Sequence, residues 1–305
     1  MGKRYIWQRK IDYWLCAKKI YTSHITKGVV AKILGIDSNL IKDISIRNRC
    51  INVFTSDYLY KFQLYGDNIK IDLKNRNRFS YYMLPLMSPI KVYKRIPLTI
   101  MMPILERPID NEEMACYILN RLKVVGHETV FKLNNYPFIM DGLNTLRNCR
   151  YVSGRRIGEE LQKYLQKREG IMVRAGIVHG DFHRDNIMCK GNIPVLIDFD
   201  CFRENDVQAI DALYYILEEV RHKNGYKKPW LEEWLLTYEN IDMVYNYKCI
   251  EYVDIDFKFG FIILLLERIS QDQRYDYLFI QSNERIVKKI KQKLIKELKS
   301  LMNTR

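Results

Sequence analysis

The spacing of apolar residues changes within the first third of the chain. Between Val29 and Leu34 apolar side chains recur at helical spacing, and Gly35 follows where a helix commonly ends. Residues 1–40 are therefore expected to be helical. From Ile41 the apolar residues fall in short β-prone runs separated by turn-like sequences, which predicts three antiparallel strands. These runs lie around residues 44–46, 51–53 and 59–64.

The next part of the chain returns once to helical character before two further strands. Residues 74–87 are expected to form a helix, and six of its first nine residues are basic or aromatic. Short apolar runs at residues 90–92 and 98–102 predict the two strands. The chain up to about residue 105 is therefore expected to be β-rich, with one helix inside it.

From residue 106 to residue 305 the pattern is mainly helical. Asp110-Asn111-Glu112-Glu113 places acids in the first turn of a helix, and residues 158–170 predict another helix that leads into the loop after it. Asp206 is expected to cap a later helix. Because no stretch rich in Pro, Gly or Ser separates the two parts, we expect a short connection between two domains, 1–105 and 106–305, of an α+β protein.

Polar side chains at fixed spacing lie among short apolar runs in the middle of the chain. Residues 178–188 read Val-His-Gly-Asp-Phe-His-Arg-Asp-Asn-Ile-Met, and residues 195–200 read Val-Leu-Ile-Asp-Phe-Asp. Between them Lys-Gly-Asn is a turn sequence, which predicts a hairpin. The hairpin would hold Asn186 near Asp198, with Asp181 on the approach to both.

These side chains suit phosphoryl transfer. A nucleoside triphosphate arrives with a divalent cation, which prefers hard oxygen ligands such as a carboxylate and an amide oxygen. A further carboxylate must orient the acceptor hydroxyl and take its proton. His-Gly-Asp, four residues, Asn and then Ile-Asp-Phe-Asp resembles the catalytic and metal-binding loops of the aminoglycoside phosphotransferase and choline kinase family, a branch of the protein-kinase-like fold.

The resemblance implies a two-lobed fold, with a small antiparallel β lobe and a larger, mainly helical lobe. It implies Asp181 as the catalytic base and Asn186 and Asp198 as ligands of Mg²⁺. His179 is expected to pack under the catalytic loop, and Asp211 matches a family aspartate that braces the backbone of that loop. The implied activity is transfer of the γ-phosphate of ATP to a hydroxyl group of a small molecule.

Three residues of the small lobe are expected to bind the nucleotide. The family places a lysine on the third strand, where Lys61 lies, pointing at the α- and β-phosphates. A lysine among large apolar residues is costly to bury without an anionic partner, although an edge-strand lysine facing water is the alternative. Met102 and Ile104 fall in the expected hinge, residues 101–105, which would hold adenine mainly through backbone groups.

The sequence departs from the family pattern in the small lobe. The family usually has a glutamate on the small-lobe helix that pairs with the strand lysine, but no acid occurs between Asp72 and Glu106. The turn at residues 47–49 also lacks the glycines of protein kinases. These departures leave open a pseudokinase or a nucleotide-dependent binding module, which the intact catalytic motifs oppose. A protein kinase is less favoured, because Ala-Pro-Glu is missing after the Asp-Phe-Asp loop.

The acceptor is left open among a sugar, an amino alcohol and an aminoglycoside-like molecule. Six acids of the helical part are candidates for binding a cationic acceptor, and equally for exposed helix faces. They are Glu218, Glu219, Glu232, Glu233, Asp254 and Asp256. The net charge of +14 mildly favours a neutral or anionic acceptor over a polycation.

Composition limits the partners and the compartment. The excess of basic residues favours anionic partners such as nucleotide phosphates, but it forms no concentrated patch, so nucleic acid is not an expected partner. The 7 cysteines are scattered and odd in number, which argues against a disulfide framework or a zinc site and fits a reducing compartment. We therefore expect a cytoplasmic protein.

Two stretches bear on membrane contact. The longest apolar run, residues 259–266, falls far short of the roughly 18 residues that a membrane-spanning helix needs. Residues 286–298 form an apolar stripe flanked by lysines, which predicts a basic amphipathic helix. We expect this helix to pack on the large lobe, with contact to a membrane surface as the weaker alternative.

Overall fold

The structure is a computed structural model, and part of the chain lies outside its description. It describes residues 27–47, 50–63, 68–83, 86–93, 98–125, 129–133, 136–148, 152–168, 170–227 and 230–271. Residues 1–26 of the stretch expected to be helical, residues 48–49 of the expected turn and the basic stripe at residues 286–298 lie outside these ranges.

The chain divides into two compact units. The first contains Met1–Arg107 and Met188–Asp200, and the second contains Pro108–Ile187 and Cys201–Arg305. The sequence led us to expect one boundary near residue 105, without a return of the chain to the first part. Residues 188–200 belong to the first unit because isolated β-bridges join Leu196 to Met87 and Cys189 to Glu106.

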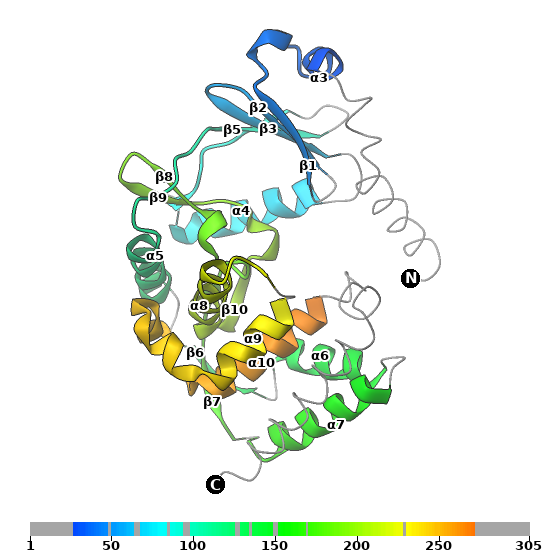
Figure 1. The fold of residues 1–305 in the computed structure, drawn as a ribbon, viewed down its shortest axis with the longest axis vertical. Helices are drawn as coiled ribbons and strands as arrows, with labels where there is room; N and C mark the ends of the chain where they lie inside the picture. The colour runs from blue at the N-terminus through cyan, green and yellow to red at the C-terminus, as the bar shows by residue number, and fades with distance from the viewer. Residues whose placement is uncertain are drawn as a thin grey trace. The chain divides into compact units, whose positions relative to one another are not determined.

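An antiparallel sheet forms the centre of the first unit (Figure 1). Its strands are β1 (Asp43–Arg47), β2 (Cys50–Phe54), β3 (Tyr58–Gln63), β4 (Lys91–Tyr93) and β5 (Thr99–Pro103). Their order across the sheet is β1-β2-β3-β5-β4, and all neighbouring pairs are antiparallel. The strands that the sequence pattern predicted in this region are therefore confirmed.

The two faces of this sheet are covered by different helices. Helix α3 (Lys27–Leu34) packs on one face and helix α4 (Asn68–Met83) on the other. The α3 cluster contains Val30, Ala31, Ile51, Val53 and Phe62, and the α4 cluster contains Cys50, Ile69, Ile100 and Met102. Because side chains alternate along a strand, Lys61 lies on the opposite face from Phe62, that of α4. The short 3₁₀ helix η1 (Ser38–Leu40) connects α3 to β1.

Helix α4 differs from the helix predicted over residues 74–87. It begins at Asn68 and ends at Met83. The residues that pack it on the sheet include Ile69 and Leu73, which precede the predicted start. The earlier start brings Asp72 into the helix, so the expectation of a small-lobe helix without an acid is wrong.

A hairpin precedes the Asp-Phe-Asp motif in the first unit. Strands β8 (Ile187–Lys190) and β9 (Ile193–Leu196) form a separate two-stranded sheet. Gly191, in the turn between them, has φ of 61°, a conformation that glycine adopts without strain. The predicted hairpin is confirmed, and it ends in the short 3₁₀ helix η5 (Phe199–Cys201).

The second unit is mainly helical, as predicted, and it also contains a small antiparallel sheet. Its helices are α5 (Asn111–Val125), α6 (Pro137–Arg147), α7 (Val152–Gln166), α8 (Ala209–Lys223), α9 (Trp230–Glu239) and α10 (Phe257–Gln271), with the 3₁₀ helices η4 (Arg184–Asn186), η6 (Ile241–Asn246) and η7 (Lys248–Tyr252). The sheet contains β6 (Thr129–Lys132), β7 (Met172–Val178) and β10 (Arg203–Val207), in the order β10-β7-β6.

Three predicted helix boundaries of this unit have different outcomes. The acidic start of α5 is confirmed, since the Asp110 carboxylate accepts a hydrogen bond from the Glu113 amide at 2.9 Å. The helix expected over residues 158–170 ends at Gln166, and strand β7 leads into the loop with the His-Gly-Asp motif instead. The cap expected at Asp206 is wrong, because Asp206 lies in β10 and accepts hydrogen bonds from the Tyr136 hydroxyl and the Val207 amide.

Helices α6 and α10 pack closely in the second unit (Figure 1). A Cβ atom at Gly142 of α6 would lie 2.4 Å from the Leu266 carbonyl oxygen of α10. This contact explains why α6 has a glycine in its middle, where glycine is otherwise unfavourable. None of the helices in the described ranges has the length and apolar character needed to cross a membrane.

We expect Gly142→Ala to destabilise the protein by about 1–3 kcal/mol, because the backbone of α10 must move to accommodate the methyl group. The free energy of unfolding in urea measures this change. Gly170→Ala is the control, since a Cβ atom there meets nothing within 4 Å. Equal stability of the two variants would contradict the close approach of α6 and α10.

Candidate active site

The loop that begins with the His-Gly-Asp motif at residue 179, called the central loop here, follows strand β7 directly. Its first residue, His179, is fully buried, consistent with the expected position under the loop. Gly180 has φ of 77°, and a Cβ atom there would lie 2.3 Å from the Cys201 carbonyl oxygen. The glycine of the His-Gly-Asp motif is therefore required both by its backbone conformation and by the closeness of the chain at Cys201.

Asp211, in the first turn of α8, holds the backbone of this loop. Its carboxylate accepts hydrogen bonds from the amides of His179 at 2.6 Å and Gly180 at 2.9 Å. The side chain is buried, and burial raises the pKa of Asp211 in spite of these two bonds. Asp211 thus supplies the acceptors that two irregular, buried N–H groups need.

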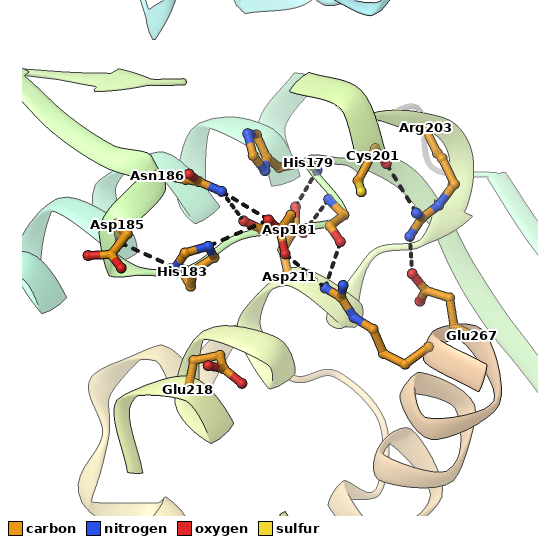
Figure 2. A network of polar contacts seen from close by, with 12 residues as sticks. His179, Asp181, His183, Asp185, Asn186, Cys201, Arg203, Asp211, Glu218 and Glu267 are labelled. Carbon is orange, nitrogen blue, oxygen red and sulfur yellow. Dashed lines mark hydrogen bonds and ion pairs between the residues drawn. The ribbon is translucent and has the colours of Figure 1, made fainter. Parts of the chain in front are cut away.

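Asp181 lies at the centre of a polar network (Figure 2). Its carboxylate is 3.5 Å from His183 Nε2 and 3.4 Å from Arg268 Nη2. The Asn186 side-chain nitrogen donates to the Asp181 carbonyl at 2.8 Å and to its carboxylate at 3.2 Å. The Asp181 side chain keeps 27% exposure, so it is held in place and still accessible.

The network keeps Asp181 ionised. Burial alone would raise the pKa of this carboxyl group, but the hydrogen bond from His183 and the charge of Arg268 outweigh it and hold the pKa well below its usual range. The same pairing raises the pKa of His183, although its burial acts in the opposite direction. A carboxylate of this kind remains a hydrogen-bond acceptor, although it is a weak base.

Arg268 is a site residue that the sequence did not reveal. It lies on α10, far along the chain from the loop, and it donates a hydrogen bond to the Gly180 carbonyl at 2.8 Å. Its guanidinium group also lies over the ring of Tyr214, 3.8 Å from the ring centre. Only a folded structure brings α10 to the loop, so no local sequence signal marks this arginine.

Asn186 has the chemistry expected of a metal ligand. It lies in the 3₁₀ turn η4 and is only 6% exposed. Because its nitrogen donates to Asp181, the oxygen is the remaining polar atom of its side chain. Amide oxygen is a hard ligand of the type that Mg²⁺ binds.

The first unit brings Lys61 and Asp198 together. Lys61 Nζ lies 3.3 Å from Asp198 Oδ1, with 19% and 31% of the two side chains exposed. Burial would lower the pKa of Lys61, but the negative charges of Asp198 and Asp72, with the hydrogen bond to Asp198, outweigh it, and the pKa is raised. Lys61 therefore has an anionic partner within the first unit. Its strand, β3, lies between β2 and β5, so the alternative of a water-facing lysine on an edge strand does not apply.

The two expected adenine contacts lie at the end of β5 in the same unit. Met102 is 6% exposed and belongs to the α4-side core cluster. Ile104 is 41% exposed, and its amide donates a hydrogen bond to the Asp57 carbonyl at 2.8 Å. Contact of either residue with a nucleotide stays a prediction.

These features define the class of the protein. An antiparallel β unit with a lysine–aspartate pair, and a mainly helical unit with a braced His-Gly-Asp loop, together form an α+β, protein-kinase-like fold. Residues 128–209 match the model of the phosphotransferase enzyme family (APH). No curated protein matches the sequence.

Solved structures with similar folds include kinases and phosphotransferases that act on small molecules. Choline kinase LicA from Streptococcus pneumoniae is 12% identical, with 92% of this chain and 99% of that chain covered and a TM-score of 0.54. A thermostable mutant of aminoglycoside phosphotransferase APH(4)-Ia is 10% identical, with 91% and 100% covered and a TM-score of 0.53. Amicoumacin kinase hAmiN, in complex with AMP-PNP, Ca²⁺ and Ami, is 11% identical, with 92% and 96% covered and a TM-score of 0.51.

The comparisons confirm the resemblance that the sequence motifs indicated. The chain resembles the aminoglycoside phosphotransferase and choline kinase family, and its fold is kinase-like. The family match covers the loop that carries Asp181 and Asn186, the hairpin and Asp198. Together these findings support a kinase, that is, a phosphotransferase enzyme.

We expect Asp211→Ala to lower the free energy of unfolding by about 2–4 kcal/mol, because two buried N–H groups lose their acceptor. Amide hydrogen exchange at His179 and Gly180 should become faster at the same time. Asp211→Asn, which keeps one acceptor oxygen, should have about half the effect, and Asp141→Asn on the exposed face of α6 should have none. Unchanged exchange at His179 and Gly180 in Asp211→Ala would contradict the bracing role.

Proposed function

We propose that the protein is an ATP- and Mg²⁺-dependent phosphotransferase that moves the γ-phosphate of ATP to a hydroxyl group of a small molecule. The observation that carries this proposal is the state of Asp181. Its carboxylate is fixed by Asn186, His183 and Arg268, stays ionised, and remains partly exposed. Such a group can accept a hydrogen bond from an incoming hydroxyl and fix its direction of attack.

The proposed role of Asp181 is orientation first and proton removal second. Since its pKa is held low, the carboxylate takes the proton only as the hydroxyl becomes acidic during transfer. Phosphoryl transfer tolerates a weak base, because catalysis depends mainly on positioning and on neutralising charge. His179 and Asp211 would support this role by fixing the loop backbone.

We propose Asn186 and Asp198 as the Mg²⁺ ligands. An amide oxygen and a carboxylate are hard donors, which fits Mg²⁺, an ion that commonly takes one or two carboxylates plus phosphate oxygens and water. Within the described ranges no three His, Cys, Asp or Glu side chains cluster around a possible ion, and a Mg²⁺ site of this kind needs no such cluster. When bound, Mg²⁺ would neutralise the charge on the phosphates.

Lys61, Met102 and Ile104 complete the proposed nucleotide site. Lys61 is cationic and has a carboxylate partner, so exchange of part of this pairing for phosphate oxygens is chemically reasonable. Met102 and Ile104 are proposed near adenine from their place at the end of β5. The cytoplasm is the expected compartment, because the cysteine pattern fits reducing conditions.

We expect Asp181→Ala to reduce Mg²⁺-dependent ATP consumption about a thousandfold, in keeping with the loss of a general base and its orienting effect. The assay measures ADP formation by the full chain with a panel of sugars, amino alcohols and aminoglycosides. Asp185→Asn, an exposed acid of the same loop, is the matched control and should retain activity. Equal turnover by Asp181→Ala and the wild type would contradict the proposal, whereas nucleotide binding without any turnover would favour a nucleotide-dependent binding module.

The acids of the helical unit bear on the class of acceptor. Glu218 and Glu233 both pair with Arg221, at 2.7 Å and 3.0 Å, and Glu219 pairs with Arg184 at 3.3 Å. Breaking a largely buried ion pair leaves an uncompensated charge, which is strongly unfavourable. These carboxylates are therefore poorly suited to take up a cationic acceptor.

The remaining candidates are also engaged in the structure. Asp254 lies 3.5 Å from Arg174, and Asp256 accepts a hydrogen bond from the Phe259 amide at the start of α10. The side chain of Glu232 lies outside the described part of the molecule. Since the described candidates have internal partners and the net charge is +14, we propose a neutral or anionic acceptor, such as a sugar.

We expect kcat/KM for neutral or anionic hydroxyl compounds to exceed that for polycationic aminoglycosides by about tenfold or more, because a polycation meets net positive charge while the described candidate acids of the helical unit already have internal partners. The comparison uses matched acceptors, such as a sugar and its amino-sugar counterpart, under the same salt conditions. Turnover of cationic acceptors alone would reverse this assignment and leave the phosphotransferase proposal intact.

A further inference from the structure

The backbone at Asp198 has an unusual conformation. Asp198 has φ of 62°, in the left-handed region that residues other than glycine adopt infrequently. A conformation of this kind persists only where neighbouring groups hold it. The groups that hold it are therefore of interest, because Asp198 is the proposed metal ligand of the first unit.

Side chains of helix α4 form hydrogen bonds with both the carbonyl and the amide of Phe199, the residue after Asp198. The Asn75 side-chain nitrogen donates to the Phe199 carbonyl at 2.8 Å and to the Asp200 carbonyl at 3.2 Å. The Asp72 carboxylate, one turn earlier on α4, accepts from the Phe199 amide at 2.8 Å. Both the donor and the acceptor of Phe199 are thus bound by one helix.

The side chains around these bonds are buried and fixed. Asp72 and Arg76 form an ion pair at 3.1 Å with 3% of each side chain exposed, and Arg76 also donates to the Ser88 carbonyl at 3.3 Å. The ring of Phe199 lies 4.7 Å from that of Phe79 on α4, between centroids. The contact therefore combines a buried ion pair, hydrogen bonds and a ring contact.

The sequence predicted a small-lobe helix without an acid, but α4 contains Asp72, and its contacts show what this acid does. The acid of α4, Asp72, forms its ion pair with Arg76 and its hydrogen bond with Phe199, while Lys61 pairs directly with Asp198. Helix α4 therefore acts on the Asp198 loop through the backbone of the following residues. Lys61 acts on the same loop through the carboxylate of Asp198.

We propose that Asn75 and Asp72 are positioning residues, which hold the loop after β9 in the conformation that presents the Asp198 carboxylate to a divalent cation. The inference rests on the proposed function in one respect, the assignment of Asp198 as a metal ligand. Asn75 touches neither the cation nor the nucleotide in this proposal. It acts by fixing the carbonyls of Phe199 and Asp200.

The test compares Asn75→Ala with Asn77→Ala. Both replace an asparagine in α4, so their effects on helix propensity match, but Asn75 is 8% exposed and Asn77 lies on the exposed face. The first measurement is binding of Mn²⁺ with AMP-PNP to the full chain, followed by electron paramagnetic resonance. We expect Asn75→Ala to weaken Mn²⁺ binding about tenfold and Asn77→Ala to leave it unchanged.

Two further readouts separate positioning from a general loss of structure. Asn75→Ala should lower the unfolding midpoint below that of Asn77→Ala, because two carbonyls lose their donor. Hydrogen exchange at the Phe199 amide should become faster by more than this loss of global stability accounts for, whereas exchange at amides far from the loop should follow the global stability alone. Asn75→Gln, which keeps an amide donor, should recover part of the Mn²⁺ affinity. If Asn75→Ala does not fold, Asn75→Gln alone decides the comparison with Asn77→Ala.

The outcomes distinguish this inference from the proposed function. Equal Mn²⁺ affinity of Asn75→Ala and Asn77→Ala, in a wild type that consumes ATP, would overturn the positioning role and leave the function standing. A wild type that binds Mn²⁺ and AMP-PNP but transfers no phosphate would overturn the function, and the difference between the variants would still support the positioning role. A wild type that binds no Mn²⁺ with the nucleotide would overturn both.

Discussion

The need to satisfy backbone N–H and C=O groups in short irregular loops governs the arrangement of this molecule. The loops that carry Asp181 and Asp198 have no strand partner along part of their length, and buried backbone groups without partners cost about 1–3 kcal/mol each. In the second unit Asp211 accepts from two loop amides, and Arg268 donates to the carbonyl between them and Asp181. Residues of two helices, α8 and α10, therefore supply the partners for the amide and carbonyl groups of this loop.

In the first unit, different residues supply hydrogen-bond partners for the backbone of the Asp198 loop. Asn75 and Asp72 bind the carbonyl and the amide of Phe199, as Asp211 and Arg268 do for the other loop. In both units the loop follows a strand, and the binding side chains come from a helix that is distant in sequence. The strands fix where each loop begins, and the helices fix its course, so small shifts of α4 or α8 would be transmitted to the carboxylates.

Sequence patterns predicted the parts of this fold that rest on local signals. The strand alternation of the first unit and the hairpin after Ile187 follow from side-chain period and turn chemistry, and the His-Gly-Asp and Asp-Phe-Asp motifs indicated the fold by resemblance. The missed features depend on distant contacts. Strand β7 and the role of Arg268 need pairing across the second unit, and α4 was placed too late because a polar, basic helix gives little apolar periodicity.

The pairing of Asp181 with Arg268 has a chemical consequence if Asp181 acts as proposed. A neighbouring guanidinium group reduces the basicity of a carboxylate, which would be a disadvantage in a reaction limited by proton removal. In phosphoryl transfer the phosphorus–oxygen bond to the leaving group is largely broken before much charge develops on the attacking hydroxyl. Direction and distance of the hydroxyl then matter more than the strength of the base. Fixing Asp181 through Arg268, His183 and Asn186 gains precise orientation at the expense of basicity, which this reaction tolerates.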